Sequence, residues 1–267
     1  MSTQNKYALV TGGTSGIGYE LATLLANDGY NLVIIARGQE ALDTTAKEIK
    51  SAAAVEVVTL SKDLFESEAP FEIYDDLKAK NIQVDILVND AGQGQYGEFV
   101  NTDIRKEMDI IQLNITSLVV LTKLFLKDMV DRKSGRILNV ASVASKIPGP
   151  LQSVYHGTKA FVHSFTEAIR NEVKDSGVVI TSLLPGATAT DFFNKANMLE
   201  AKNIKDGKLA DPADVAKDGY KALMDDDDMV VSGFANKVQV AMSNLTPDAI
   251  VAEQVHKQQA PKQTSEQ

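Results

Sequence analysis

TGGTSGIG, at residues 11–18, directly follows the apolar run YALV at residues 7–10 and precedes a segment of helical period. The sequence therefore predicts a strand, a glycine turn and a helix in that order. Glycine allows a tight turn and a close backbone approach, and the free N–H groups at a helix start attract phosphate. The stretch predicts a dinucleotide-binding turn. Its spacing differs from G-x-G-x-x-G, so a purely structural glycine turn stays open as an alternative.

Working outward from this turn, short apolar runs rich in β-branched residues alternate with segments of helical period. The expected strands are Tyr7–Val10, Leu32–Ile35, Val55–Leu60, Val84–Val88, Arg136–Val140 and Val178–Leu184. Continuous apolar runs suit strands buried on both faces, and their alternation with helices predicts βαβ units. The predicted fold class is α/β, a doubly wound parallel sheet of the Rossmann type with helices on both faces.

Two long helices are expected in the second half of the chain. Apolar residues at three- and four-residue spacings predict one over Asp103–Asp131 and another over residues 153–174. The acidic run Asp225–Asp228 is expected to be a solvated turn. A single domain over residues 1–257 is predicted, and the polar residues 258–267 are expected to form a disordered tail.

Composition bounds the classes of function. The 267 residues are 44% hydrophobic and 24% charged, so the chain can bury a substantial core. The chain has no cysteine, which suits a reducing compartment. Its first residues do not match a secretory signal. We therefore expect a soluble cytoplasmic protein without a membrane span. The net charge of −9 disfavours nucleic acid as a partner.

A charged residue at the end of the second strand indicates which dinucleotide binds. An acidic side chain about twenty residues after the glycine turn would bind a ribose 2′-hydroxyl. Ala36 cannot do this, whereas the planar cation of Arg37 suits a 2′-phosphate. The sequence therefore predicts NADP(H), although a solvated arginine at a strand end is the simpler interpretation of Arg37 alone.

The chain as a whole resembles the short-chain dehydrogenase/reductase family, in its compact single-domain branch. The resemblance rests on the TGxxxGxG turn at residues 11–18, Asp63-Leu64, the segment at residues 89–92, the Y-x-x-x-K motif of Tyr155 and Lys159, and Pro185-Gly186. The segment at residues 89–92 corresponds to the family's Asn-Asn-Ala-Gly, from which Asp90 departs. The resemblance implies that the cofactor is bound by Gly12, Thr14, Ser15, Gly16, Ile17, Gly18, Arg37, Asp63, Leu64, Asn89, Ala91, Gly92, Tyr155, Lys159, Pro185, Gly186, Thr188 and Thr190.

The same resemblance implies four catalytic residues, Asn114, Ser142, Tyr155 and Lys159. Tyr155 and Lys159 stand four apart on a helix and therefore share a face. A neighbouring ammonium is expected to lower the pKa of the phenol, which would make Tyr155 the general acid/base. Ser142 would position the carbonyl oxygen.

Asn114 has two interpretations. On the apolar face of its helix it is more simply a hydrogen-bonded structural residue, whereas by resemblance it holds a water in a proton relay from Lys159. The three histidines, His156, His163 and His256, show no metal-ligand spacing, so no metal is predicted.

The sequence thus predicts an NADP(H)-dependent carbonyl reductase or alcohol dehydrogenase. Alternatives are an NADP-binding sensor or scaffold protein without turnover, which would usually lack the tyrosine or lysine, and an NAD(H)-linked epimerase or dehydratase, which would need a larger substrate domain. Residues 188–209 are expected to form a flap, with Phe192, Phe193 and Met198 favouring a partly hydrophobic small-molecule substrate. A homodimer through the two long helices is the expected assembly.

Overall fold

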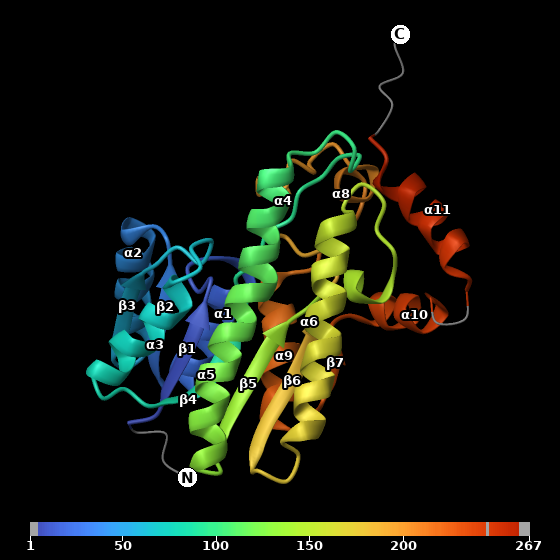
Figure 1. The fold of residues 1–267 in the computed structure, drawn as a ribbon. Helices are drawn as coiled ribbons and strands as arrows, with labels where there is room; N and C mark the ends of the chain where they lie inside the picture. The colour runs from blue at the N-terminus through green and yellow to red at the C-terminus, as the bar shows by residue number, and fades with distance from the viewer. Residues whose placement is uncertain (1–4, 244–245, 262–267) are drawn as a thin grey trace.

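The computed structural model describes residues 5–243 and 246–261. Its centre is a seven-stranded parallel sheet of order β3-β2-β1-β4-β5-β6-β7, with helices on both sides (Figure 1). The strands are β1 (Tyr7–Thr11), β2 (Asn31–Ala36), β3 (Val57–Ser61), β4 (Val84–Asn89), β5 (Gly135–Val140), β6 (Val178–Leu184) and β7 (Met229–Val231). The predicted α/β class is confirmed. Sequence reasoning missed β7, because it has only three residues.

Two apolar layers cover the sheet. On one face α1 (Gly16–Asn27), α2 (Gln39–Ala52) and α9 (Pro212–Met224) bury Leu21, Leu42 and Val215 against the strands. On the other face lie α3 (Ala69–Ala79), α5 (Leu118–Asp131) and α6 (Ser153–Glu172), packed through side chains such as Leu77 and Phe125. Central strands such as β1 and β2 are buried on both faces, which is why they are apolar throughout.

The first long helix is interrupted by a π-helical turn. It consists of α4 (Ile104–Ile111), the turn η1 (Gln112–Ser117) and α5. This run, Ile104–Asp131, is long and apolar enough to cross a membrane by length and composition, although the sequence was expected to contain no such stretch. Its inner side packs on the sheet, as in a core helix, and π-turns of this kind occur often at functional sites.

Beyond β6 the chain returns over the carboxyl edge of the sheet. Two short helices, α7 (Phe192–Lys195) and α8 (Lys202–Lys205), lie in the expected flap. The last two helices are α10 (Phe234–Ser243) and α11 (Asp248–Gln259), and Figure 1 places α11 beside α8. The acidic run at 225–228 is the turn between α9 and β7, as predicted.

The expected boundary of the ordered domain at residue 257 is wrong. The helix α11 continues to Gln259, and Lys202 N–H donates to Ala260 O at 3.2 Å. Gln259 is also buried. Polar composition suggested a tail, but one buried glutamine and a backbone hydrogen bond hold this segment on α8. The remainder of the expected tail, residues 262–267, lies outside the described residues.

Candidate active site

The glycine turn lies where the strand order reverses, between β1 and β4. In doubly wound sheets this switch point at the carboxyl edge is where ligands bind. The backbone of Gly16 has φ +56, and a Cβ atom there would lie 2.8 Å from Thr190 Cγ2. Glycine is therefore required at this position by both the backbone conformation and the approach of the flap. The turn leads into the N-terminus of α1, whose N–H groups favour an anion.

A cavity of about 650 Å³ runs from this turn along the carboxyl edge of the sheet. Most of the cofactor-binding residues expected from the sequence line it: Gly12, Thr14, Ser15, Gly16, Ile17, Arg37, Asp63, Leu64, Ala91, Gly92, Tyr155, Lys159, Pro185, Gly186, Thr188 and Thr190. Ser142 lines it as well. The structure therefore brings together residues from seven separate segments of the chain.

Two of the expected cofactor-binding residues do not line this cavity. Gly18 lies behind the turn, where a Cβ atom would come within 2.6 Å of both Gly12 O and Asp90 Oδ2. Asn89 is buried and donates to Thr122 Oγ1 at 3.0 Å and to Asn139 Oδ1 at 2.9 Å. Both residues support the shape of the cleft from behind its wall. Direct contact of either residue with the cofactor stays a prediction.

Arg37 stands exposed at the rim beside the glycine turn. Its guanidinium lies 5.1 Å from the centroid of the Phe65 ring, which orients the cation across the mouth of the cavity. Ser61 Oγ donates to Arg37 O at 2.8 Å and fixes the backbone there. Lys62, also in the cavity wall, was missed in the sequence and is paired with Glu72 and Asp76. Arg37 is thus available to a phosphate.

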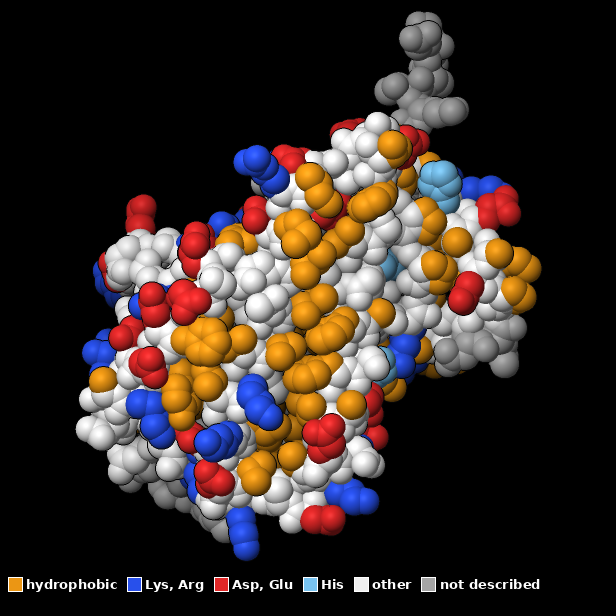
Figure 2. All heavy atoms as spheres, viewed as in Figure 1, with side chains coloured by type: hydrophobic (Ala, Val, Ile, Leu, Met, Phe, Trp, Pro, Cys, Tyr) orange, Lys and Arg blue, Asp and Glu red, His pale blue; other side chains and the backbone are white. Residues whose placement is uncertain are grey.

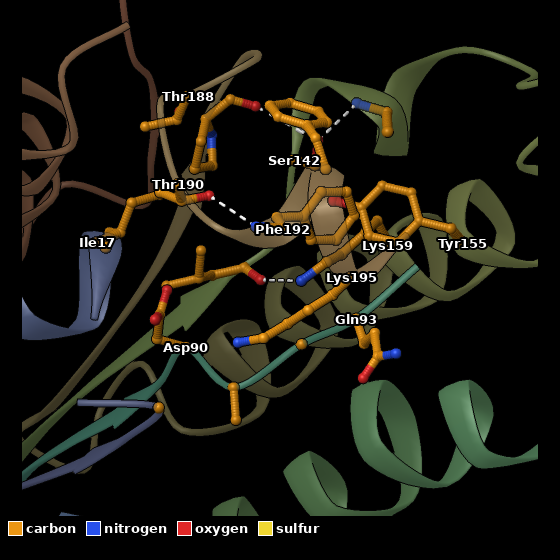
Figure 3. A pocket seen from close by; sticks show the side chains of 18 of the residues that line it. Ile17, Asp90, Gln93, Ser142, Tyr155, Lys159, Thr188, Thr190, Phe192 and Lys195 are labelled. Carbon is orange, nitrogen blue, oxygen red and sulfur yellow. Dashed lines mark hydrogen bonds between the residues drawn. The ribbon is translucent and has the colours of Figure 1, made fainter. Parts of the chain in front are cut away.

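The candidate catalytic groups lie at the inner end of the cavity (Figure 3). Ser142 follows β5, and its side chain accepts from Ala144 N–H at 3.1 Å. Tyr155 and Lys159 are one turn apart on α6, with Lys159 Nζ 5.9 Å from the centroid of the Tyr155 ring. The Phe192 ring of the flap packs on Tyr155, with 5.0 Å between the ring centroids. An apolar lid thus covers the phenol.

The pKa of Tyr155 differs from the expectation. Burial raises it to about 12; the hydrogen bond with Ser142 lowers it, and the negative charge of Asp90 raises it further. The expected lowering by the Lys159 ammonium is absent, because Lys159 Nζ donates to Val140 O at 2.7 Å. Tyr155 is therefore held as a neutral phenol, ready to donate a proton.

Asp90 is the second residue that changes the electrostatics. Its carboxylate lies against the glycine turn, and burial raises its pKa to about 7, while the Lys159 charge and the Gly18 N–H lower it. Burial lowers the pKa of Lys159 to about 8, and Asp90 opposes this. The departure from the family motif at Asp90 therefore places an acid beside the catalytic lysine.

Asn114 is buried in η1 and does not line the cavity. Its amide nitrogen donates to Gln93 O at 2.9 Å and to Thr158 Oγ1 at 3.0 Å, and its Oδ1 accepts from Gln93 N–H at 3.0 Å. These contacts match the structural interpretation of Asn114. They connect the loop after Asp90, through Gln93, to Thr158 on α6. The space at Gly92 is narrow, because a Cβ atom there would lie 3.4 Å from both Asn114 Oδ1 and Lys159 Nζ.

Two of the three histidines make structural contacts. His156 is buried with Nδ1 2.9 Å from Ile147 O, and His163 contacts Lys146 and Ser182. Over residues 5–243 and 246–261, no group of three or more His, Cys, Asp or Glu residues could hold a metal ion.

A cap that the sequence only partly predicted covers the Tyr155 end of the cavity, where Phe192 packs on the Tyr155 ring. The buried apolar cluster of the flap includes Phe193, Met198 and Ile204, which line the cavity as well. Tyr96 packs on this cluster, and its hydroxyl donates to Gln259 O at 2.6 Å. The helix α11 therefore forms part of the wall. No local sequence pattern indicated the contact between Tyr96 and Gln259, because the two residues are far apart in the chain.

The arrangement fits a nicotinamide dinucleotide. The glycine turn and α1 offer anion-binding N–H groups at one end, Arg37 offers a cation at the rim, and the Tyr155 hydroxyl and Lys159 ammonium lie at the other end of a continuous cavity. A carbonyl beside Tyr155 could receive its proton. Fold and cleft together suit a protein that binds a nicotinamide dinucleotide.

Comparison with known proteins identifies the family. Residues 6–201 match the short chain dehydrogenase family model, and the chain belongs to that family. It is 38% identical over 194 residues to a very-long-chain 3-oxoacyl-CoA reductase of Bos taurus, covering 69% of this chain. A very-long-chain 3-oxoacyl-CoA reductase-B of Danio rerio is 39% identical over 190 residues. The match spans 60% of the length of each of these relatives.

Solved structures show the same fold. A short-chain dehydrogenase from Sphingobium yanoikuyae in complex with NADPH has a TM-score of 0.80 and 26% identity, covering 90% of this chain and 94% of that chain. An alcohol dehydrogenase from Comamonas testosteroni, specific for bulky-bulky ketones, has a TM-score of 0.76 and 25% identity, covering 93% of this chain and 98% of that one. The chain is a member of the short chain dehydrogenase family with a single-domain Rossmann-type fold.

Proposed function

We propose that the protein is an NADP(H)-dependent reductase of the 3-oxo group of acyl thioesters. The observation that carries this proposal is the shared cavity of Ser142, Tyr155 and Arg37, with a neutral phenol at its inner end. The acyl substrate follows from the likeness to proteins named very-long-chain 3-oxoacyl-CoA reductases. The apolar side chains of the cap suit an acyl chain.

Each residue has a role in carbonyl reduction. The cofactor, when bound, supplies the hydride. The Ser142 hydroxyl donates a hydrogen bond to the substrate oxygen and holds it at the phenol. Tyr155 gives that oxygen a proton as the alcohol forms, and a pKa of about 12 keeps this proton on the phenol at neutral pH. Lys159, whose Nζ donates to Val140 O, lines the same cavity one helical turn from Tyr155.

The choice of NADP(H) over NAD(H) rests on Arg37. Its exposed guanidinium lies at the rim near the glycine turn and stacks on Phe65, where the preceding Ala36 leaves no carboxylate to bind a ribose. The binding of NADPH by the Sphingobium yanoikuyae enzyme supports the proposal.

A substrate panel tests the function. NADPH consumption is followed with a medium-chain 3-oxoacyl thioester, a 3-oxo ester and a simple ketone of equal length. The expected result is the highest kcat/KM for the thioester. No turnover of any of them would favour the alternative of an NADP-binding sensor or scaffold, and NADPH binding measured by fluorescence would then distinguish a sensor from an inactive preparation. We place the reaction in the cytoplasm, which fractionation of the native cells would test.

A further inference from the structure

Among the described residues, three side-chain amides in the cavity wall have a buried atom without a hydrogen-bond partner, those of Gln152, Asn203 and Gln259, and the two glutamines are the most deeply buried of them. Gln152, just before α6, has 5% of its surface exposed, and Gln259, at the end of α11, has 6%. Gln152 Nε2 and Gln259 Oε1 have no hydrogen-bond partner, and both residues line the cavity. An unpaired buried polar atom destabilises the folded protein, so each of these two atoms indicates a position where a bound ligand would supply the missing partner. Gln152 Nε2 is a hydrogen-bond donor, and Gln259 Oε1 is an acceptor.

Gln152 lies at the end of the cavity where Tyr155 is placed. A Cβ atom on Gly94 would lie 3.4 Å from Gln152 Nε2, 3.3 Å from Tyr155 Cδ2 and 2.8 Å from Phe192 Cζ. Gln152 Nε2 therefore lies beside the ring of the proton donor and under the flap. The glycine turn and Arg37, where the dinucleotide phosphates would bind, are on the opposite side of the switch point.

The Tyr96 segment connects the second glutamine to the first. The Tyr96 hydroxyl donates to Gln259 O at 2.6 Å, and the next residue, Gly97, donates its N–H to Leu151 O at 2.8 Å, directly before Gln152. Tyr96 N–H also donates to Ala196 O at 3.0 Å. One loop thus ties α11, the flap and the start of α6 into a single wall.

We infer that Gln152 and Gln259 form a polar subsite that binds a substrate with a hydrogen-bond acceptor close to the reacting carbonyl and a donor farther along. This inference rests on the proposed function and refines it. In a 3-oxoacyl thioester on a pantetheine arm, the thioester carbonyl is such an acceptor and the amide N–H of the arm is such a donor. Gln152 Nε2 donates to the first, and Gln259 Oε1 accepts from the second.

The pairing predicts selectivity between carbonyl compounds. A simple ketone would fill the apolar cap but would leave both amide groups unpaired, and a site built to hydrogen-bond discriminates against ligands that lack the bonding group. Phe193, Met198 and Ile204 accept the acyl chain in either case. The apolar cluster therefore binds the chain, and the two glutamines distinguish the thioester arm.

The test uses three substrates with the same 3-oxoacyl chain: an ethyl ester, an N-acetylcysteamine thioester and a coenzyme A thioester. The ethyl ester lacks the N–H donor, and the N-acetylcysteamine arm supplies it without a nucleotide. In Gln259→Met, the ratio of kcat/KM for the N-acetylcysteamine thioester to that for the ethyl ester should fall roughly three- to tenfold. Gln254→Met, on the exposed side of the same helix, is the matched control and should keep the wild-type ratio.

Gln152→Met gives the second half of the test. A simple ketone of equal chain length, which has no second carbonyl, is added as the reference substrate. The variant should lower kcat/KM for the ethyl ester and for the N-acetylcysteamine thioester, each relative to this ketone, by a similar factor. Equal kcat/KM of the wild-type protein for the N-acetylcysteamine and coenzyme A thioesters would assign recognition to the pantetheine arm. A higher kcat/KM for the coenzyme A thioester would show that its nucleotide contributes as well.

The outcomes separate this inference from the proposed function. Unchanged ratios in both variants, or equal losses on every substrate, would overturn the subsite while leaving the reductase intact. Absence of turnover by the wild-type protein with all 3-oxo substrates would overturn the proposed function, and the subsite with it. Thermal melting of each variant shows whether the cap still folds, and the substrate ratio stays informative even in a destabilised variant because both substrates meet the same protein.

Discussion

Lys159 Nζ lies 5.9 Å from the centroid of the Tyr155 ring and donates its 2.7 Å hydrogen bond to Val140 O. The two side chains share a helix face, but the ammonium is directed toward β5 and not toward the phenol. Burial consequently dominates the pKa of Tyr155 and raises it to about 12. This arrangement suits proton donation, and so the reductive direction.

The first prediction concerns pH. Because Tyr155 stays protonated up to a pKa of about 12, the reduction rate should lose nothing to its ionisation between about pH 6 and pH 9. Alcohol oxidation needs the phenolate, so its rate should rise with pH without a plateau below about pH 10. Steady-state pH–rate profiles in both directions check this. A plateau in oxidation near neutral pH would show that the bound cofactor lowers the pKa far more than the protein alone.

The second prediction concerns Tyr155→Phe, which removes one oxygen and keeps the ring against Phe192. Turnover should fall by about 10²–10⁴, while folding and NADPH binding survive. Single-turnover kinetics and cofactor fluorescence measure the two effects. Tyr74→Phe, which loses a hydrogen bond to Asp128 on the outer helices, is the matched control. Near-normal activity in Tyr155→Phe would exclude it as the acid.

The third prediction concerns the cofactor. Arg37→Ala should weaken NADPH binding roughly ten- to a hundredfold, the equivalent of a charge-assisted hydrogen bond, and leave NADH binding much less affected. Titration of both cofactors checks this, with Arg105→Ala on the exposed face of α4 as the control. Equal affinities of the unmutated protein for NADPH and NADH would show that Arg37 does not contact a 2′-phosphate.

The fourth prediction concerns stability. Burial raises the pKa of the Asp90 carboxyl group from 3.8 to about 7. Between these values the folded protein holds a proton that the unfolded chain has released, so stability falls as pH rises through this window. Asp90→Asn cannot release the proton, and its free energy of unfolding relative to wild type should therefore increase from about pH 4 to about pH 7. Urea unfolding across this range measures it, and a constant difference would contradict the assignment.

The fifth prediction concerns assembly. Ile104 and Met108 on α4 and Phe161 on α6 are exposed, and Figure 2 shows an apolar stripe over these helices. Such a stripe favours pairing, and we expect a homodimer. Phe161→Asp should shift it toward monomer in light scattering at several concentrations, whereas Lys47→Asp on α2 should not. A tetramer at every concentration would contradict a dimer through these helices.

The sequence by itself determined the local elements of this protein. The apolar runs predicted six of the strands, and the glycine turn, Arg37 and the Y-x-x-x-K motif located the cavity, because each depends on residues close together in the chain. The positions of Arg37 and Tyr155 follow directly from the strand that precedes the one and the helix that carries the other. The resemblance added the family, which residues 6–201 confirm.

Only the tertiary structure decided what depends on distant neighbours. The pKa of the Tyr155 phenol depends on the burial of its ring and on the hydrogen bond that directs Lys159 toward Val140. Sequence spacing could not reveal either feature. Gln259 looked like part of a polar tail, yet its contact with Tyr96 across the chain makes it a wall of the cavity. Periodicity reports which face of an element is apolar, whereas the partner of a buried polar group is fixed only when the elements pack.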